Sequence, residues 1–122
     1  MRAVQLSAPG PVGNLRLTTL RLPPERDGWV RIRVEAFGLN RSELKLRLGL
    51  SVGASFPRVP GYFGDAADLP REALQEILDA VTAGRLAFPV DRVYDGLEQE
   101  PQAHDNMEHD RATGKLVVRV RH

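Results

Sequence analysis

Five residues near the middle of the chain carry side chains that could act on a small molecule with a carbonyl group. Glu43 could serve as a general base if an apolar wall raises its pKa. Tyr62 could donate a hydrogen bond to an oxyanion or an enol, and the amide of Asn40 could orient a carbonyl or a water molecule. Arg41 could pair with a substrate carboxylate, and Phe63 could pack beside it. The chemistry of these side chains makes Glu43, Tyr62 and Asn40 catalytic candidates. It makes Arg41 and Phe63 substrate-binding candidates.

Each of the same residues also has a purely structural interpretation. Asn40 is a good N-cap for a short helix that we expect over 41–48. Glu43 would then lie in the first helical turn, where the helix dipole favours an acid. Tyr62 and Phe63 could simply pack at a dimer seam, and Arg41 could be a solvated surface residue. Residue type alone leaves these alternatives open.

A second group of polar residues has the spacing of metal ligands. His104 and Glu108 are four residues apart on one predicted helix, which also carries Asp105 and His109. The chain has no cysteine, which excludes a disulfide, a thiolate nucleophile and a cysteine zinc site. It also has no Gly-x-Ser-x-Gly motif of the kind that carries a serine nucleophile.

The bulk properties are those of one small domain, 1–122, with a modest core. The 17 basic and 16 acidic residues leave a net charge of +1, and the basic ones are scattered, so we expect no nucleic-acid partner. No apolar run approaches the ~20 residues that span a bilayer, and the N-terminus lacks the pattern of a signal peptide. The expectation is a cytoplasmic protein without membrane contact.

Apolar periodicity predicts an α+β fold that is mainly β in its first half. Trp29 to Phe37 is the clearest expected strand, because Val30, Ile32, Val34 and Ala36 alternate with charged residues. After Pro70 we expect a helix whose apolar stripe comprises Leu74, Ile77, Leu78 and Val81. The remaining expected elements are strands at 2–6, 15–20, 88–94 and 115–120 and a helix at 97–110. The second half of the chain therefore follows an αβαβ order.

Three stretches together resemble one known family. The segment from Val34 to Leu44 resembles the strand-turn-helix segment of zinc-less medium-chain dehydrogenases of the quinone oxidoreductase type. Phe56 to Gly61 resembles their Pro-Gly approach to the active-site cleft, and Ala103 to Val118 resembles their C-terminal helix and strand. The resemblance implies a GroES-like partial β-barrel with two C-terminal helices. It also places the five candidate residues near the cleft of that family.

The departures from the family pattern bear on cofactors. The N-terminal family segment, 1–61, is joined to the C-terminal one, 69–122, by 62–68 alone, so the family's nicotinamide-binding domain is not between them. No Gly-x-Gly-x-x-Gly turn follows a strand. Asn40 stands where zinc-dependent relatives have a cysteine, and the Ala103-His104 pair is ordinary in a family helix that binds no metal. We therefore expect no cofactor, neither a nicotinamide nor a metal.

Three functional hypotheses follow from this resemblance. The first is a cofactor-independent lyase, isomerase or cyclase, in secondary metabolism, that acts on a carbonyl or enol substrate. The second is a non-catalytic binding module or a degenerate dehydrogenase remnant. The third is an oxidoreductase whose partner chain supplies the site for NADPH. The missing barrel strands would leave a bare sheet edge, so we expect a homodimer formed by sheet continuation or segment exchange.

Overall fold

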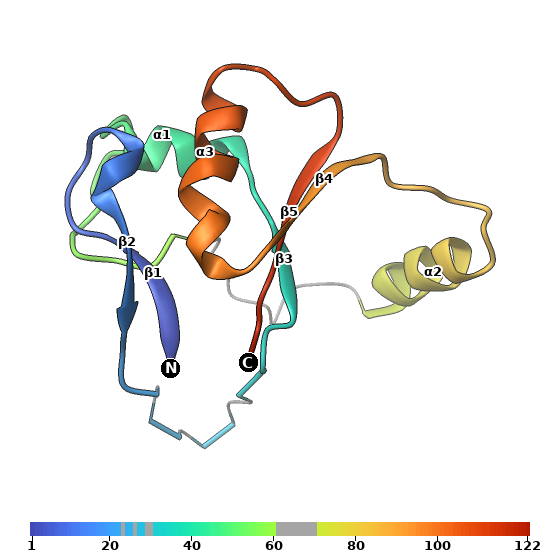
Figure 1. The fold of residues 1–122 in the computed structure, drawn as a ribbon. Coiled ribbons are helices and arrows are strands. Elements are labelled where there is room, and N and C mark those ends of the chain that lie inside the picture. The colour runs from blue at the N-terminus through green and yellow to red at the C-terminus, as the bar shows by residue number, and fades with distance from the viewer. Residues whose placement is uncertain (23, 26, 29–30, 61–70) are drawn as a thin grey trace.

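The structure is a computed structural model that describes residues 1–22, 24–25, 27–28, 31–60 and 71–122, without the side chains of 71–73. Strands and helices are both present, and the described strands form two sheets with no closed barrel (Figure 1). The predicted α+β class is confirmed. None of the helices in the described ranges is long and apolar enough to cross a membrane. Pro70, after which a helix is expected, lies outside the described residues.

The first sheet has two antiparallel strands, β1 (Arg2–Leu6) and β2 (Leu15–Thr19). The turn between them contains a short 3₁₀ helix, η1 (Val12–Asn14). Gly10 adopts a φ of 147° in this turn, a conformation that side-chain-bearing residues rarely take. Leu6 pairs with Leu15 at the turn end of the sheet, and both leucines are buried in the core. Both strands were predicted from their apolar content.

The second sheet is mixed and has the strand order β3-β5-β4. The C-terminal strand β5 (Lys115–Arg119) lies in the middle, antiparallel to β3 (Ala36–Gly38) and parallel to β4 (Val90–Asp95). Parallel neighbours need a crossover connection, and here it consists of the 3₁₀ helix η3 (Leu97–Gln99) and the helix α3 (Glu100–Glu108). The αβαβ order of the second half is thus confirmed.

The long strand expected from Trp29 to Phe37 is wrong. Only Ala36–Gly38 forms a strand, and residues 31–34 have no strand assignment, while Trp29 and Val30 lie outside the described residues. The apolar side of the alternation is exposed as well, 76% for Ile32 and 47% for Val34. The physical reason is the register: β5 ends at Arg119, opposite Ala36, and residues 31–34 have no partner strand among the described residues.

The core lies where α3 and the short helix α1 (Arg41–Arg47) meet the two sheets (Figure 1). Leu46 of α1 contributes to the core, as do Ala103 and Met107 of α3. Tyr94 is also buried, and its hydroxyl accepts a hydrogen bond from the Asn106 side-chain amide at 2.6 Å. The other buried members of this cluster are Val4, Leu6, Leu15, Leu39, Leu97, Leu116 and Val118.

The helix α2 (Arg71–Thr82) stands apart from both sheets (Figure 1). Its position in the chain agrees with the prediction, but its apolar stripe is not in the core. The four side chains of the stripe remain between 38% and 52% exposed: Leu74, Ile77, Leu78 and Val81. The spacing of apolar residues indicates that a helix has an apolar face, but it does not indicate what covers that face.

Candidate functional site

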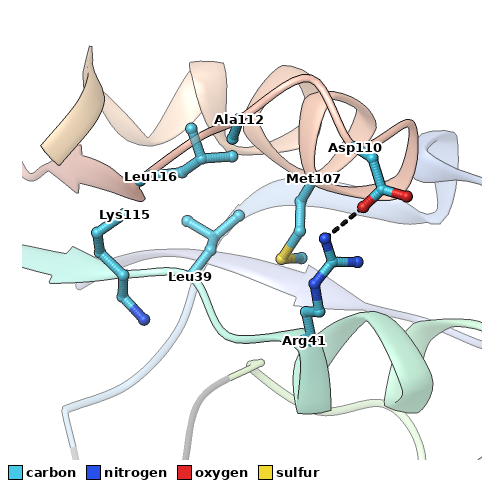
Figure 2. A pocket seen from close by; sticks show the side chains of 8 residues that line it. Leu39, Arg41, Met107, Asp110, Ala112, Lys115 and Leu116 are labelled. Atoms are coloured by element: carbon cyan, nitrogen blue, oxygen red, sulfur yellow. Dashed lines mark hydrogen bonds and ion pairs between the residues drawn. The ribbon is translucent and has the colours of Figure 1, made fainter. Parts of the chain in front are cut away.

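A small pocket lies between the start of α1, the end of α3 and the start of β5 (Figure 2). Its volume is about 100 Å³, roughly that of three water molecules in the liquid. Its lining combines apolar side chains with charged ones at the rim: Leu39, Arg41, Met107, Asp110, Ala112, Gly114, Lys115 and Leu116. The pocket is thus smaller than the ~300–1,000 Å³ usual for drug-sized ligands.

The start of α1 is held by local hydrogen bonds. Asn40 is the N-cap with extended backbone, and its N–H donates to the Glu43 carboxylate at 2.8 Å, as in a capping box. The Lys115 ammonium donates to the Asn40 side-chain oxygen at 2.5 Å. The first turn of α1 is therefore tied to the first residue of β5, which is 75 positions away in the sequence.

Two cationic side chains reach the pocket from different elements. Arg41 projects from α1 and forms an ion pair with Asp110, which follows α3 (Figure 2). The stem of Lys115 passes over Gly38 of β3, so closely that a Cβ atom on Gly38 would overlap the Lys115 Cε and lie 3.3 Å from its Cγ. A glycine is thus required at position 38 for Lys115 to take this path.

Glu43 points away from solvent, and only 7% of the residue is exposed. Burial raises the pKa of its carboxyl, while the hydrogen bond from the Asn40 N–H and the charge of Lys115 act in the opposite direction. Glu43 is not among the residues that line the described pocket. Its carboxylate accepts the Asn40 N–H as a capping group, in agreement with the structural interpretation of Glu43 as a first-turn acid.

A buried polar cluster lies beside Glu43, between α1 and α3. Glu100 and His104, both on α3, are 4% and 1% exposed, and the His104 Nε2 is 3.8 Å from a Glu100 carboxylate oxygen. Burial, together with the charge of Glu43, raises the pKa of Glu100 to about 8. Burial and the nearby Arg47 lower the pKa of His104 to about 4. Both side chains are therefore uncharged near neutral pH.

Arg47 completes this cluster from the α1 side and is 1% exposed. Its guanidinium forms an ion pair with Glu108 at the end of α3 and donates to the Gly10 carbonyl oxygen at 2.6 Å. Three segments that are distant in the sequence meet at this one side chain. The arginine thus links the turn after β1, α1 and α3.

The structure brings together three of the five sequence-predicted site residues, Asn40, Arg41 and Glu43, at the start of α1. Of these, Arg41 lines the described pocket. Tyr62 and Phe63 lie outside the described residues, so their proposed roles stay predictions. The sequence analysis did not identify Lys115 or Asp110 as site residues, although it predicted the last strand to begin at Lys115. No sequence signal indicated that the beginning of this strand lies beside α1, because the fold brings the two together.

Comparison with known proteins gives a family match over most of the chain. A family model described as zinc-binding dehydrogenase matches residues 12–118. The synaptic vesicle membrane protein VAT-1 homolog-like proteins of Mus musculus and Homo sapiens are each 41% identical over 63 residues. That stretch is 51% of this chain and 15% of each relative, so the chain spans a small part of their length. No solved structure matches.

The family description names zinc, but the described residues of this chain do not provide a set of zinc ligands. Zinc sites in proteins use three or four Cys, His, Asp or Glu side chains. The sequence has no cysteine, and no group of three or more such ligands occurs in the part of the chain that the structure describes. His104 and His109 of the predicted metal-ligand spacing diverge, since the first is buried and the second is half exposed. The residues that the structure describes therefore do not fit zinc.

Proposed function

This chain belongs to the zinc-binding dehydrogenase family, and on that premise we propose that it is a small-molecule-binding module whose pocket between α1 and β5 holds a small carboxylate or a similar oxyanion. One observation carries the proposal: Arg41 and Lys115, on either side of Leu39, both line a pocket that also has apolar side chains in its lining (Figure 2). Cationic donors above an apolar floor are suited to a short carboxylic acid.

The charge and donor count of the rim support an anionic ligand. Arg41 and Lys115 contribute two positive charges and Asp110 one negative charge, so the rim keeps a net positive charge. An ammonium has three N–H donors and a guanidinium five, whereas the bonds to Asn40 and Asp110 engage only part of them. Each cation therefore keeps donors that could bind a carboxylate without displacing its present partner.

The size of the pocket limits the ligand. A volume of about 100 Å³ corresponds to roughly three water molecules. Formate, acetate and the carboxyl end of a longer acid are within this limit, and the methyl end would contact Leu39, Met107 and Leu116. Substrates of the size of a quinone exceed the described pocket.

Titration of the ¹⁵N-labelled chain with acetate tests the proposal. We expect saturable amide shifts that centre on Asn40, Arg41 and Lys115, lost in Lys115→Met because its ammonium is removed. Lys45→Met is the matched control, since Lys45 is an exposed lysine of α1 away from the pocket. Absence of saturable shifts in the wild type, or equal shifts in Lys115→Met, would contradict the proposal.

A cofactor-independent acid–base enzyme is the second candidate, and it is favoured by the raised pKa of Glu43. A carboxyl with a raised pKa beside an ammonium could remove a proton next to a carbonyl group. The test is deuterium exchange at the methyl group of pyruvate, followed by proton NMR. Exchange that is fast with the wild type, lost in Glu43→Gln and kept in Glu98→Gln, an exposed control, supports this candidate. Exchange at the uncatalysed rate with the wild type would rule out the acid–base enzyme.

A further inference from the structure

A continuous set of contacts connects the rim of the pocket to two buried carboxyl groups. The Lys115 ammonium donates to the Asn40 side-chain oxygen at 2.5 Å, and the Asn40 N–H donates to the Glu43 carboxylate at 2.8 Å. Beyond Glu43 lies Glu100 of α3, and the charge of Glu43 acts on its carboxyl. The two glutamates are 7% and 4% exposed, whereas Lys115 is exposed. One asparagine therefore stands between a solvated cation and this buried acid pair, Glu43 and Glu100.

The acid pair holds a proton that responds to nearby charge. Two carboxyl groups that share a water-excluded site cannot both ionise at low cost. Burial and the charge of Glu43 accordingly raise the pKa of Glu100 to about 8. Glu100 therefore keeps its proton at neutral pH, and a modest change in the local charge is enough to alter how tightly that proton is held.

The other charged groups of α1 and α3 near the acid pair already have partners or are neutral. Arg47 forms an ion pair with Glu108 and donates to the Gly10 carbonyl oxygen at 2.6 Å. The His104 ring lies 3.8 Å from Glu100, and its pKa of about 4 leaves it uncharged at neutral pH. These groups are fixed by the packing of the two helices, so none of them connects the acid pair to the pocket.

The remaining elements that pack against α3 point to Lys115 as the connecting charge. The 3₁₀ helix η1 has no titratable residue, and Glu98 of η3 is exposed and paired with Arg2. From β5, the side chain of Arg119 is exposed, whereas the charge of Lys115 lowers the pKa of the Glu43 carboxyl. Lys115 thus belongs both to the pocket and to the electrostatic environment of the acid pair.

An anion in the pocket changes that environment. A carboxylate bound at Lys115 offsets the charge of the ammonium, so the field that favours ionised Glu43 becomes weaker. The acid pair then binds a proton more tightly than it does in the free protein. Such coupling is reciprocal, so protonation of the acid pair strengthens carboxylate binding by the same factor.

We propose that a carboxylate binds at Lys115 together with a proton that the acid pair takes up from solvent, with Asn40 connecting the two sites. This inference rests on the carboxylate pocket proposed above and adds its regulation by pH. Binding is tightest while Glu100 is protonated and weakens as the pH rises through about 8, where Glu100 loses its proton. The buried acids therefore act on a ligand that they do not contact.

The methyl group of Met107, which lines the pocket, can report binding across this pH range. The chain has two methionines, so methyl-¹³C labelling gives two signals, and these protons do not exchange with water at high pH. At constant ionic strength, we expect the dissociation constant of acetate to rise about threefold between pH 6.5 and 9, as for coupling between partly screened charges. Glu100→Gln should abolish this rise, because an amide does not titrate. Glu98→Gln, exposed and two residues away, should preserve it.

The outcomes separate this inference from the carboxylate proposal. Saturable binding with the same dissociation constant at both pH values overturns the proton coupling and leaves the pocket in place. An equal rise in Glu100→Gln also overturns the coupling, since the titrating group then lies outside the acid pair. The absence of saturable Met107 shifts at either pH overturns the pocket and the coupling together.

Proton uptake can also be measured directly, without a change to the buried residues. Sodium acetate adjusted to pH 8 is added to a concentrated, weakly buffered solution of the protein at the same pH. We expect the pH to rise more than it does with sodium chloride, because protons leave the solvent. Lys115→Met should give the chloride result, and Lys45→Met, the exposed control, should behave as the wild type. A wild-type response equal to that of chloride, at acetate concentrations that saturate the Met107 shift, overturns the proposal.

Discussion

The imidazole of His104 and the carboxyl of Glu100 lie 3.8 Å apart between α1 and α3, and both are shielded from water. Neither ring nitrogen of His104 has a hydrogen-bond partner among the described residues. Glu43 and Arg47 face this pair from α1, Glu108 from α3, and Lys115 of β5 acts on Glu43. Ionisation of either group would place a further charge where water is excluded, which is unfavourable. Their protonation states are therefore coupled to folding.

The free energy of unfolding should decrease as the pH rises from about 6.5 to 8. In this window folded Glu100, with its pKa near 8, keeps a proton that the unfolded carboxyl, near 4.5, has lost. Stability then falls with rising pH by up to about 1.4 kcal/mol per pH unit. The contribution of Glu100 is fully present below 4.5 and disappears as the pH passes 8. Urea unfolding curves across this range measure it.

At lower pH, His104 makes the free energy of unfolding change with pH in the opposite direction. The unfolded imidazole, near 6.5, binds a proton that the folded one, near 4, does not, so stability falls as the pH decreases through this range. The two slopes offset each other between 4.5 and 6.5, where we expect a plateau. Glu100→Gln should abolish the decline above 6.5, and Glu98→Gln, exposed and two residues away, should preserve it. A flat wild-type profile above 6.5 would contradict the buried, protonated Glu100.

Local signals in the sequence were sufficient to predict α1 and the αβαβ order of elements in the C-terminal half. Asn40 is the N-cap and Glu43 lies in the first helical turn, as expected, and the two form a capping box. The helix α1 ends at Arg47, one residue before the expected end. Such signals act over three or four residues, so no knowledge of the remaining fold is needed. The same holds for β5, which was expected at 115–120 and whose alternate residues Leu116 and Val118 are buried.

Features that depend on a distant partner could not be predicted in this way. The alternation in 29–37 predicted a strand, but of its described residues only those in Ala36–Gly38 meet a partner strand. The sequence did not indicate that Glu100 is buried, because its environment is created when α3 packs against α1. The Lys115–Asn40 bond likewise joins residues 75 positions apart. Long-range packing therefore determines both the pocket and the buried cluster.

Arg47→Met should destabilise the fold by about 3 kcal/mol, because removing one partner of a buried ion pair leaves the other without compensation. Arg47 is 1% exposed, whereas Glu108 is partly solvated, with a third of its side chain exposed. The double variant Arg47→Met/Glu108→Gln should therefore recover part of the loss. Arg111→Met is the control, since its ion pair with Asp105 is exposed and should contribute less than about 1 kcal/mol. Equal effects of the two single variants in chemical denaturation would disprove the role of Arg47.

Gly114→Ala should weaken the contact between β4 and β5. A Cβ atom at position 114 would overlap the Pro89 carbonyl oxygen and lie 3.0 Å from the Asp91 nitrogen, both of them backbone atoms. That carbonyl accepts the Lys115 N–H at 2.7 Å, so relief of the overlap must disturb the parallel ladder.

Forced overpacking of this kind usually costs about 1–3 kcal/mol, and we expect a loss in that range from thermal or urea unfolding. Gly13→Ala is the matched control, because no described atom lies within 4 Å of its added Cβ. It should change stability by less than about 0.5 kcal/mol. Because Gly114 also lines the pocket beside Lys115, Gly114→Ala should weaken acetate binding as well. A variant as stable as the wild type with unchanged acetate shifts would show that β4 and β5 are not held at this close approach.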